Sequence, residues 1–268
     1  MNDTGPRPAH WRRPRVPVRL RRGAALLPTM FTLGNLFFGF WAIVRTLNGE
    51  FADAAPLIGF AVVLDMLDGR IARLTGTASE FGAELDSLAD VISFGVAPAL
   101  LAYAWAFGSI PRPGWLAAFL FVMCGTLRLA RFNVQRQVVD GRFFVGLPIP
   151  AGAAQVAAVV NFVQQPVIGR SLSIVAMAGL VVVAFLMVST LRYRSFKSID
   201  LKSRRSYIYI LGMGLLFLLV ALHPEWVWLC AACAYTLSGP IAYLVGLVRR
   251  RRSDVAQPPA QTVTEPGS

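Results

Sequence analysis

The chain has 268 residues, of which 56% are hydrophobic and 15% are charged, and its formal net charge is +12. A soluble domain usually carries about 25% charged residues, so the composition excludes an ordinary soluble domain. Apolar runs of the length needed to cross a bilayer recur along the chain. The sequence therefore predicts an all-α fold, a polytopic membrane helix bundle with about eight transmembrane helices.

Residues 1–23 are basic and rich in proline, and we interpret them as a juxtamembrane arm at the membrane interface and not as a cleaved signal peptide. The transmembrane domain is expected over residues 24–250, and a disordered cytoplasmic tail is expected over residues 251–268. Eight apolar runs define the expected spans, which are residues 24–45, 52–69, 85–107, 115–133, 147–164, 172–191, 206–222 and 226–248.

Lysine and arginine are distributed unevenly between the two sides of these spans. With the N-terminus in the cytoplasm, all but three of the 26 Lys and Arg residues fall on the cytoplasmic side, and the exceptions are Arg45, Arg112 and Arg170. The positive-inside rule then predicts a multi-pass protein of the cytoplasmic (inner) membrane with both termini in the cytoplasm. Arginine clusters on that side attract anionic lipid headgroups, which accounts for the net charge without a nucleic-acid partner.

Residues 64–90, LDMLDGRIARLTGTASEFGAELDSLAD, carry four aspartates in an otherwise apolar part of the chain. Asp65 and Asp68 close the second span, and Asp86 and Asp90 open the third, so each pair shares one helix face. Both pairs lie on the predicted cytoplasmic side, where two helices joined by a short loop could aim all four carboxylates at one point.

These four carboxylates would be costly without cations. One ionised aspartate inside a span costs about 2.5–3.5 kcal/mol, and repulsion between like charges adds to this cost. Arg70 and Arg73 could offset part of it, and divalent cations would offset more. Carboxylate oxygens suit Mg²⁺ or Mn²⁺, and two such ions about 3.5–4 Å apart would serve an in-line phosphoryl displacement.

Three small residues, Gly69, Ala72 and Gly82, lie beside the acids. Each of them alone would be explained by close helix packing, which is common in membranes. Next to the acids, they would let a nucleotide or phosphate approach the helix backbone.

The whole pattern reads Asp65-x2-Asp68-Gly69-x2-Ala72-Arg73-x8-Gly82-x3-Asp86-x3-Asp90. It resembles, without a gap, the signature of the CDP-alcohol phosphatidyltransferase family. The resemblance implies that an acceptor alcohol displaces CMP from CDP-diacylglycerol, whose diphosphate lies on two divalent cations. It implies metal ligands at Asp65, Asp68, Asp86 and Asp90, with Asp90 also the catalytic general base. It implies nucleotide-side positions at Gly69, Ala72 and Gly82, a phosphate contact at Arg73, and a homodimer.

Flanking stretches indicate the acceptor. The segments LPTMFTLGNLFFGF, LDSLADVISFGVAPALL, LRLARFNV and FFVGLPIPAGAA resemble the membrane-embedded phosphatidylserine synthases of that family, which implies L-serine as the acceptor. Arg128 and Arg131, one turn apart at the cytoplasmic end of span 115–133, could clamp a carboxylate or a lipid phosphate, and Asn133 follows at the same end. The alternative interpretation of these residues is simple positive-inside topology.

Two other functions stay open at this stage. The same transfer could use another alcohol, such as glycerol phosphate, inositol phosphate or choline. A cation transporter would also carry acidic residues in its spans, but it would place them near the midplane and on several helices.

Overall fold

The computed structural model describes residues 18–75, 79–135, 143–194 and 222–255. This part of the chain is a bundle of helices with one ribbon of two three-residue strands, so the all-α prediction is confirmed apart from that ribbon. The helices are α1 (Val18–Leu47), α2 (Phe51–Thr75), α3 (Glu80–Asp90), the π-helix η1 (Val91–Val96), α4 (Ala97–Ala106), α5 (Pro111–Gln135), α6 (Ile149–Val163), α7 (Arg170–Val188) and α9 (Pro224–Val255).

Five stretches of the described residues are long and apolar enough to cross a membrane, and these are Thr29–Leu47, Glu80–Ala106, Pro111–Val134, Arg170–Val188 and Pro224–Gly246. The shorter apolar helix α6 corresponds to the expected span 147–164. Helix α2 covers the expected span 52–69 and also carries the charged residues of the aspartate motif. The expected span 206–222 lies almost wholly outside the described residues. A multi-pass membrane helix bundle is therefore confirmed, and the count of eight spans is not.

Both ends of the predicted transmembrane domain differ from the helix ends in the structure. Helix α1 begins at Val18, before the predicted boundary at residue 24, and α9 continues to Val255, into the predicted tail. Both extensions contain arginine, which is Arg19, Arg21 and Arg22 in α1 and Arg251 and Arg252 in α9. Arginine and leucine are good helix formers, so a helix can continue past the apolar run that crosses the membrane. The remainder of the arm and of the tail lies outside the described residues.

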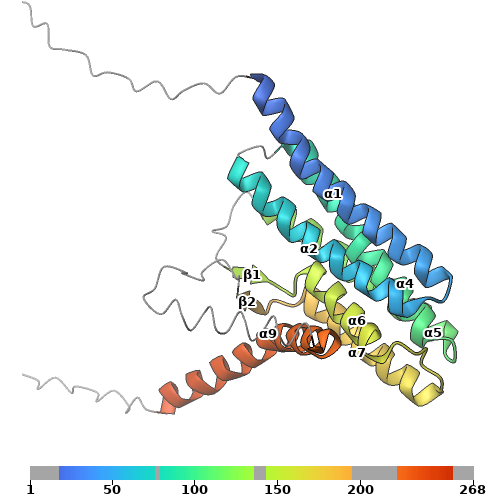
Figure 1. The fold of residues 1–268 in the computed structure, drawn as a ribbon. Helices are drawn as coiled ribbons and strands as arrows, with labels where there is room; N and C mark the ends of the chain where they lie inside the picture. The colour runs from blue at the N-terminus through green and yellow to red at the C-terminus, as the bar shows by residue number, and fades with distance from the viewer. Residues whose placement is uncertain (1–17, 76–78, 136–142, 195–221, 256–268) are drawn as a thin grey trace, which may run out of the picture.

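Helices α1 and α2 form an antiparallel pair that packs along its length (Figure 1). The turn between them is closed by ion pairs from Arg45 to Glu50 and, at 3.8 Å, to Asp53. Arg45 is one of the three basic residues on the predicted outer side, and these acids neutralise it. Helix α6 packs against α2 and α9, and α7 packs against α5, so α9 lies across the bundle from α1 (Figure 1).

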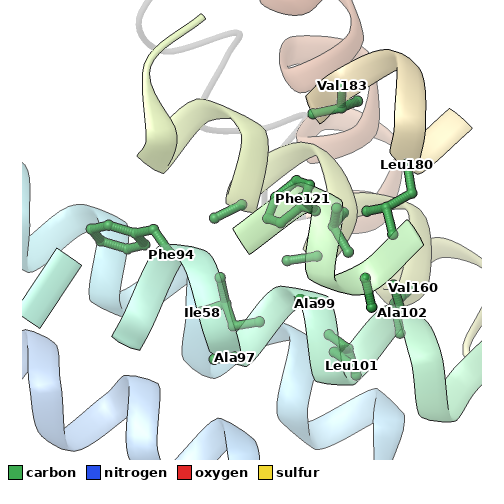
Figure 2. Close-up of a cluster of buried hydrophobic side chains, with 14 of the residues drawn as sticks. Ile58, Phe94, Ala97, Ala99, Leu101, Ala102, Phe121, Val160, Leu180 and Val183 are labelled. Atoms are coloured by element: carbon green, nitrogen blue, oxygen red, sulfur yellow. The ribbon is translucent and has the colours of Figure 1, made fainter. Parts of the chain in front are cut away.

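The segment α3–η1–α4 runs through the middle of the bundle and is more buried than the other candidate spans. Its apolar side chains meet those of the surrounding helices in one core (Figure 2). Figure 2 shows Phe94 of η1 and Leu101 of α4 with Ile58 of α2, Phe121 of α5 and Val160 of α6. Asp90 lies where α3 enters this core, and Asp86 lies one turn before it on the less buried part of α3.

A close contact between α1 and η1 fixes how the first helix packs. A Cβ atom at Gly39 would overlap the Oγ of Ser93 and would lie 2.7 Å from the Cα of Ser93. Only glycine allows this approach, because the neighbour is backbone and cannot rotate away.

We expect Gly39→Ala to destabilise the protein by about 1–3 kcal/mol, since overpacking a tight contact costs about that much. The measurement is the melting temperature in detergent. Gly179→Ala is the matched control, because a Cβ there meets nothing within 4 Å. Equal melting temperatures for the two variants would contradict a tight contact between α1 and η1.

The ribbon ties distant parts of the chain to α9. Strand β1 (Phe143–Val145) pairs antiparallel with β2 (Arg192–Arg194), with Phe144 opposite Tyr193. Tyr193 is fully buried, and its hydroxyl donates to the carbonyl of Thr236 at 3.1 Å. Burial raises the pKa of Tyr193 to about 12, so the hydroxyl keeps its proton, and can donate to α9, at a pH where an ordinary tyrosine ionises.

Candidate active site

Three of the four predicted metal ligands meet in space. One carboxylate oxygen each from Asp65 on α2 and from Asp86 and Asp90 on α3 lie within 4.8 Å of one another. Asp90 is the most deeply buried of the three, with 7% of its surface exposed. Asp68 lies one turn after Asp65 on α2, and its side chain is outside the described part of the structure.

The start of α3 explains why Asp86 and Asp90 point the same way. Ser79 caps the helix, because its Oγ accepts a hydrogen bond from the backbone N–H of Gly82 at 3.0 Å. The helix then runs without interruption through both aspartates, which are four residues apart and share a face. A Cβ at Gly82 would lie 3.0 Å from the same Ser79 oxygen, so the cap contact alone favours glycine there.

The other predicted nucleotide-side residues are on α2. Gly69 is partly buried, one residue after Asp68, and Ala72 and Arg73 follow on the same helix with side chains that are not described. Their role toward a nucleotide or phosphate stays a prediction.

The three converging carboxylates fit a divalent cation. Each supplies a hard oxygen ligand, and the spacing of at most 4.8 Å lets one ion contact all three. Without a cation, three ionised groups this close would repel one another strongly. The donor set suits Mg²⁺ or Mn²⁺ better than a softer metal, because it contains no sulfur or imidazole.

Arg128 of α5 faces these acids from inside the bundle. It is 8% exposed, and its Nε atom is buried with no hydrogen-bond partner among the described residues. Its guanidinium lies within electrostatic range of Asp90, Asp65 and Tyr235. A buried guanidinium with an unused N–H beside a carboxylate cluster is suited to hold an anionic group of a substrate.

The other two predicted acceptor residues are placed differently. Arg131 is exposed, although it is only one turn from Arg128. Asn133 donates through Nδ2 to the Oγ of Ser87 at 2.8 Å, and that hydroxyl donates to the carbonyl of Ala83. Asn133 therefore ties α5 to α3 beside the site, and a direct contact with the acceptor stays a prediction for both residues.

Two site residues were missed by the sequence analysis. Asn35 of α1 is fully buried and donates through Nδ2 to Asp90 Oδ1. An amide inside an apolar run is itself a signal of function in a membrane helix, so Asn35 could have been found. Tyr235 of α9 interacts electrostatically with Arg128, and its ring lies 5.8 Å from that of Tyr193. It lies in a segment without any recognisable motif, so the sequence offered no signal for it.

Comparison with known proteins identifies the class of this fold and site. The family model described as CDP-alcohol phosphatidyltransferase matches residues 25–199. The chain belongs to that family, and it is an enzyme of the phosphotransferase type embedded in a membrane.

Individual relatives cover most of the chain. It is 38% identical over 198 residues to a protein of Helicobacter pylori strain ATCC 700392 / 26695, an alignment that covers 72% of this chain and 81% of the relative. It is 34% identical over 215 residues to a protein of Methanocaldococcus jannaschii, covering 80% and 92%. It is 36% identical over 171 residues to a protein of Bacillus subtilis strain 168, covering 64% and 91%. Each of these relatives is named CDP-diacylglycerol–serine O-phosphatidyltransferase.

Proposed function

We propose that this protein is a phosphatidylserine synthase, which transfers the phosphatidyl group of CDP-diacylglycerol to the hydroxyl of L-serine and releases CMP. The observation that carries the proposal is the convergence of Asp65, Asp86 and Asp90 in a member of a family of phosphatidyltransferases. The choice of serine is supported by the relatives that carry that name.

The reaction balances with the residues present. The serine oxygen attacks the phosphorus that bears diacylglycerol, the bond from that phosphorus to the bridging oxygen breaks, and CMP leaves. Asp90, buried at the centre of the site, takes the proton from the serine hydroxyl as general base. Divalent cations, Mg²⁺ or Mn²⁺ and two per site, would neutralise the diphosphate and the departing CMP. Asp65, Asp68, Asp86 and Asp90 would hold them.

Arg128 supplies the acceptor side of the site in this proposal. A buried guanidinium forms strong paired hydrogen bonds with a carboxylate, and serine carries a carboxylate that alcohols such as choline lack. We assign Arg128 to the serine carboxylate, with Arg131 and Asn133 as outer contacts. The nucleotide and its phosphates would bind at the residues predicted for the nucleotide side, which are Gly69, Ala72, Arg73 and Gly82.

The proposal also includes the orientation of the protein in the membrane and its assembly as a homodimer. Asp65 lies in the second half of α2, about four helical turns from the turn that holds Arg45. Together with the arginine distribution, this supports a site on the cytoplasmic side of the inner membrane, with both termini in the cytoplasm. The lipid would then enter from the inner leaflet and serine from the cytoplasm. A homodimer is proposed from the family resemblance, and cross-linking in native membranes tests it.

The first test incubates purified protein with CDP-diacylglycerol, labelled serine and Mn²⁺ or Mg²⁺, and follows CMP and labelled lipid together. We expect equal amounts of both products and their complete loss with EDTA. Glycerol phosphate, inositol phosphate and choline are added as competitors. CMP release with one of these alcohols and not with serine would support the transfer reaction of the family but identify that alcohol, and not serine, as the acceptor. In folded protein, the absence of CMP with every acceptor and metal would contradict the proposal.

A further inference from the structure

Asn35 is a buried amide of α1 that contacts the aspartate assigned as base. It is 0% exposed, and its Nδ2 lies 3.4 Å from Asp90 Oδ1, across 55 residues of sequence. This distance is at the long end for a hydrogen bond. Such contacts in active sites often shorten only when the substrate is bound.

The position of Asn35 is fixed from the same helical segment that carries Asp90. The Oγ of Ser93 donates to the backbone carbonyl of Asn35 at 3.1 Å, and the close approach of Gly39 to Ser93 brings α1 against η1. The π-helix η1 begins directly after Asp90, and π-turns of this kind are frequent at functional sites. Asn35 is thus held through its backbone by Ser93 and through its side chain by Asp90.

The two ends of the amide have different surroundings. A carboxylate only accepts hydrogen bonds, so the donor Nδ2 is the end that faces Asp90. The other end, Oδ1, is buried with no hydrogen-bond partner among the described residues. A buried carbonyl oxygen without a donor is unfavourable, and an acceptor such as serine brings O–H and N–H donors into this site.

We propose that Asn35 is a positioning residue for the transfer reaction. Its Nδ2 orients the Asp90 carboxylate toward the acceptor hydroxyl, and its Oδ1 accepts a hydrogen bond from an O–H or N–H group of the acceptor. This inference rests on the proposed function, because it takes Asp90 as the general base. It adds a role for α1, which the aspartate motif does not include.

The test replaces Asn35 by leucine, which has a similar size and no polar atoms. We expect kcat to fall about 10- to 100-fold, the usual effect of removing a partner that orients an active-site ligand. The KM for CDP-diacylglycerol and the Mn²⁺ concentration for half-maximal rate should stay unchanged. Binding of CDP-diacylglycerol with Mn²⁺ is measured separately, as the increase in melting temperature that they cause. This increase should be the same in Asn35→Leu as in the wild type.

Asn35→Asp is the second variant, for use if leucine is not tolerated. Aspartate has the size of asparagine, but its carboxylate cannot donate a hydrogen bond to Asp90, so kcat should also fall.

Thr46→Val is the matched control on the same helix. Thr46 is also buried, and its hydroxyl donates to the carbonyl of Ala42 within α1, so the kcat of this variant should not change. Wild-type kcat in Asn35→Leu and Asn35→Asp would overturn the inference, and so would a loss confined to metal activation or lipid binding. If Asp90→Asn is inactive while both Asn35 variants are fully active, only this inference fails. If Asp90→Asn itself remains active, the base assignment in the proposed function fails.

Discussion

Replacing Asp90 by asparagine should lower the rate of phosphatidyl transfer to serine by roughly a hundred- to ten-thousandfold, the range for loss of a general base. Asparagine has nearly the same shape, so the fold should persist, but it cannot take the proton from the serine hydroxyl. It is also a weaker ligand for a cation, which adds to the loss. CMP release and labelled phosphatidylserine are measured in parallel, at saturating lipid and metal.

Asp53→Asn is the matched control for this variant. Asp53 lies in the first turn of α2, away from the aspartate cluster, and its side chain is 67% exposed and 3.8 Å from Arg45. It should keep wild-type activity. An Asp90→Asn protein that retained most of its rate would show that another group takes the proton, and inactivity of both variants would indicate a nonspecific loss of structure.

Replacing Arg128 by lysine should raise the KM for serine roughly 10- to 100-fold, which corresponds to losing a charged hydrogen bond of about 1.5–3 kcal/mol. Lysine keeps the positive charge beside Asp90 and Asp65, so the balance of charge is preserved while the paired geometry of the guanidinium is lost. The KM for CDP-diacylglycerol should not change. The measurement is a full set of initial rates in which each substrate is varied in turn.

Arg112→Lys is the control, because Arg112 is exposed at the other end of the same helix, α5, and is assigned no contact with a substrate. Ethanolamine, which is serine without its carboxylate, separates the two anions that Arg128 could hold. If Arg128 binds the serine carboxylate, Arg128→Lys narrows the preference for serine over ethanolamine. An unchanged preference with a higher KM for CDP-diacylglycerol would instead assign Arg128 to a lipid phosphate.

Several features of this protein could be predicted from the sequence because they depend on local periodicity. Apolar runs define most of the membrane helices, since each helix must satisfy its own backbone within the bilayer. The i, i+4 spacing of Asp86 and Asp90 puts both on one face of α3, whatever the rest of the chain does. The short connection to α2 then brings Asp65 into the same cluster.

The helix ends and the ribbon were harder to predict. No change in hydropathy marks the end of a helix that continues into basic residues, as α1 and α9 do. Strands of three residues, such as β1 and β2, are too short for an alternating pattern. Tyr193 of β2 contacts Thr236 and Gly239 of α9, which are more than 40 residues further along the chain.

The membrane class, the helical fold and the carboxylate motif with its family could be read from the sequence alone, because each of these follows from spacing within one or two adjacent helices. The residues that approach this motif from other helices could be identified only from the packing of the bundle. Arg128 and Arg131 look alike in the sequence, and helix packing buries one and exposes the other. Asn35 reaches Asp90 because Gly39 lets α1 approach η1. Contacts of this kind depend on which face of one helix meets another, and that choice is made by the packing of the whole bundle.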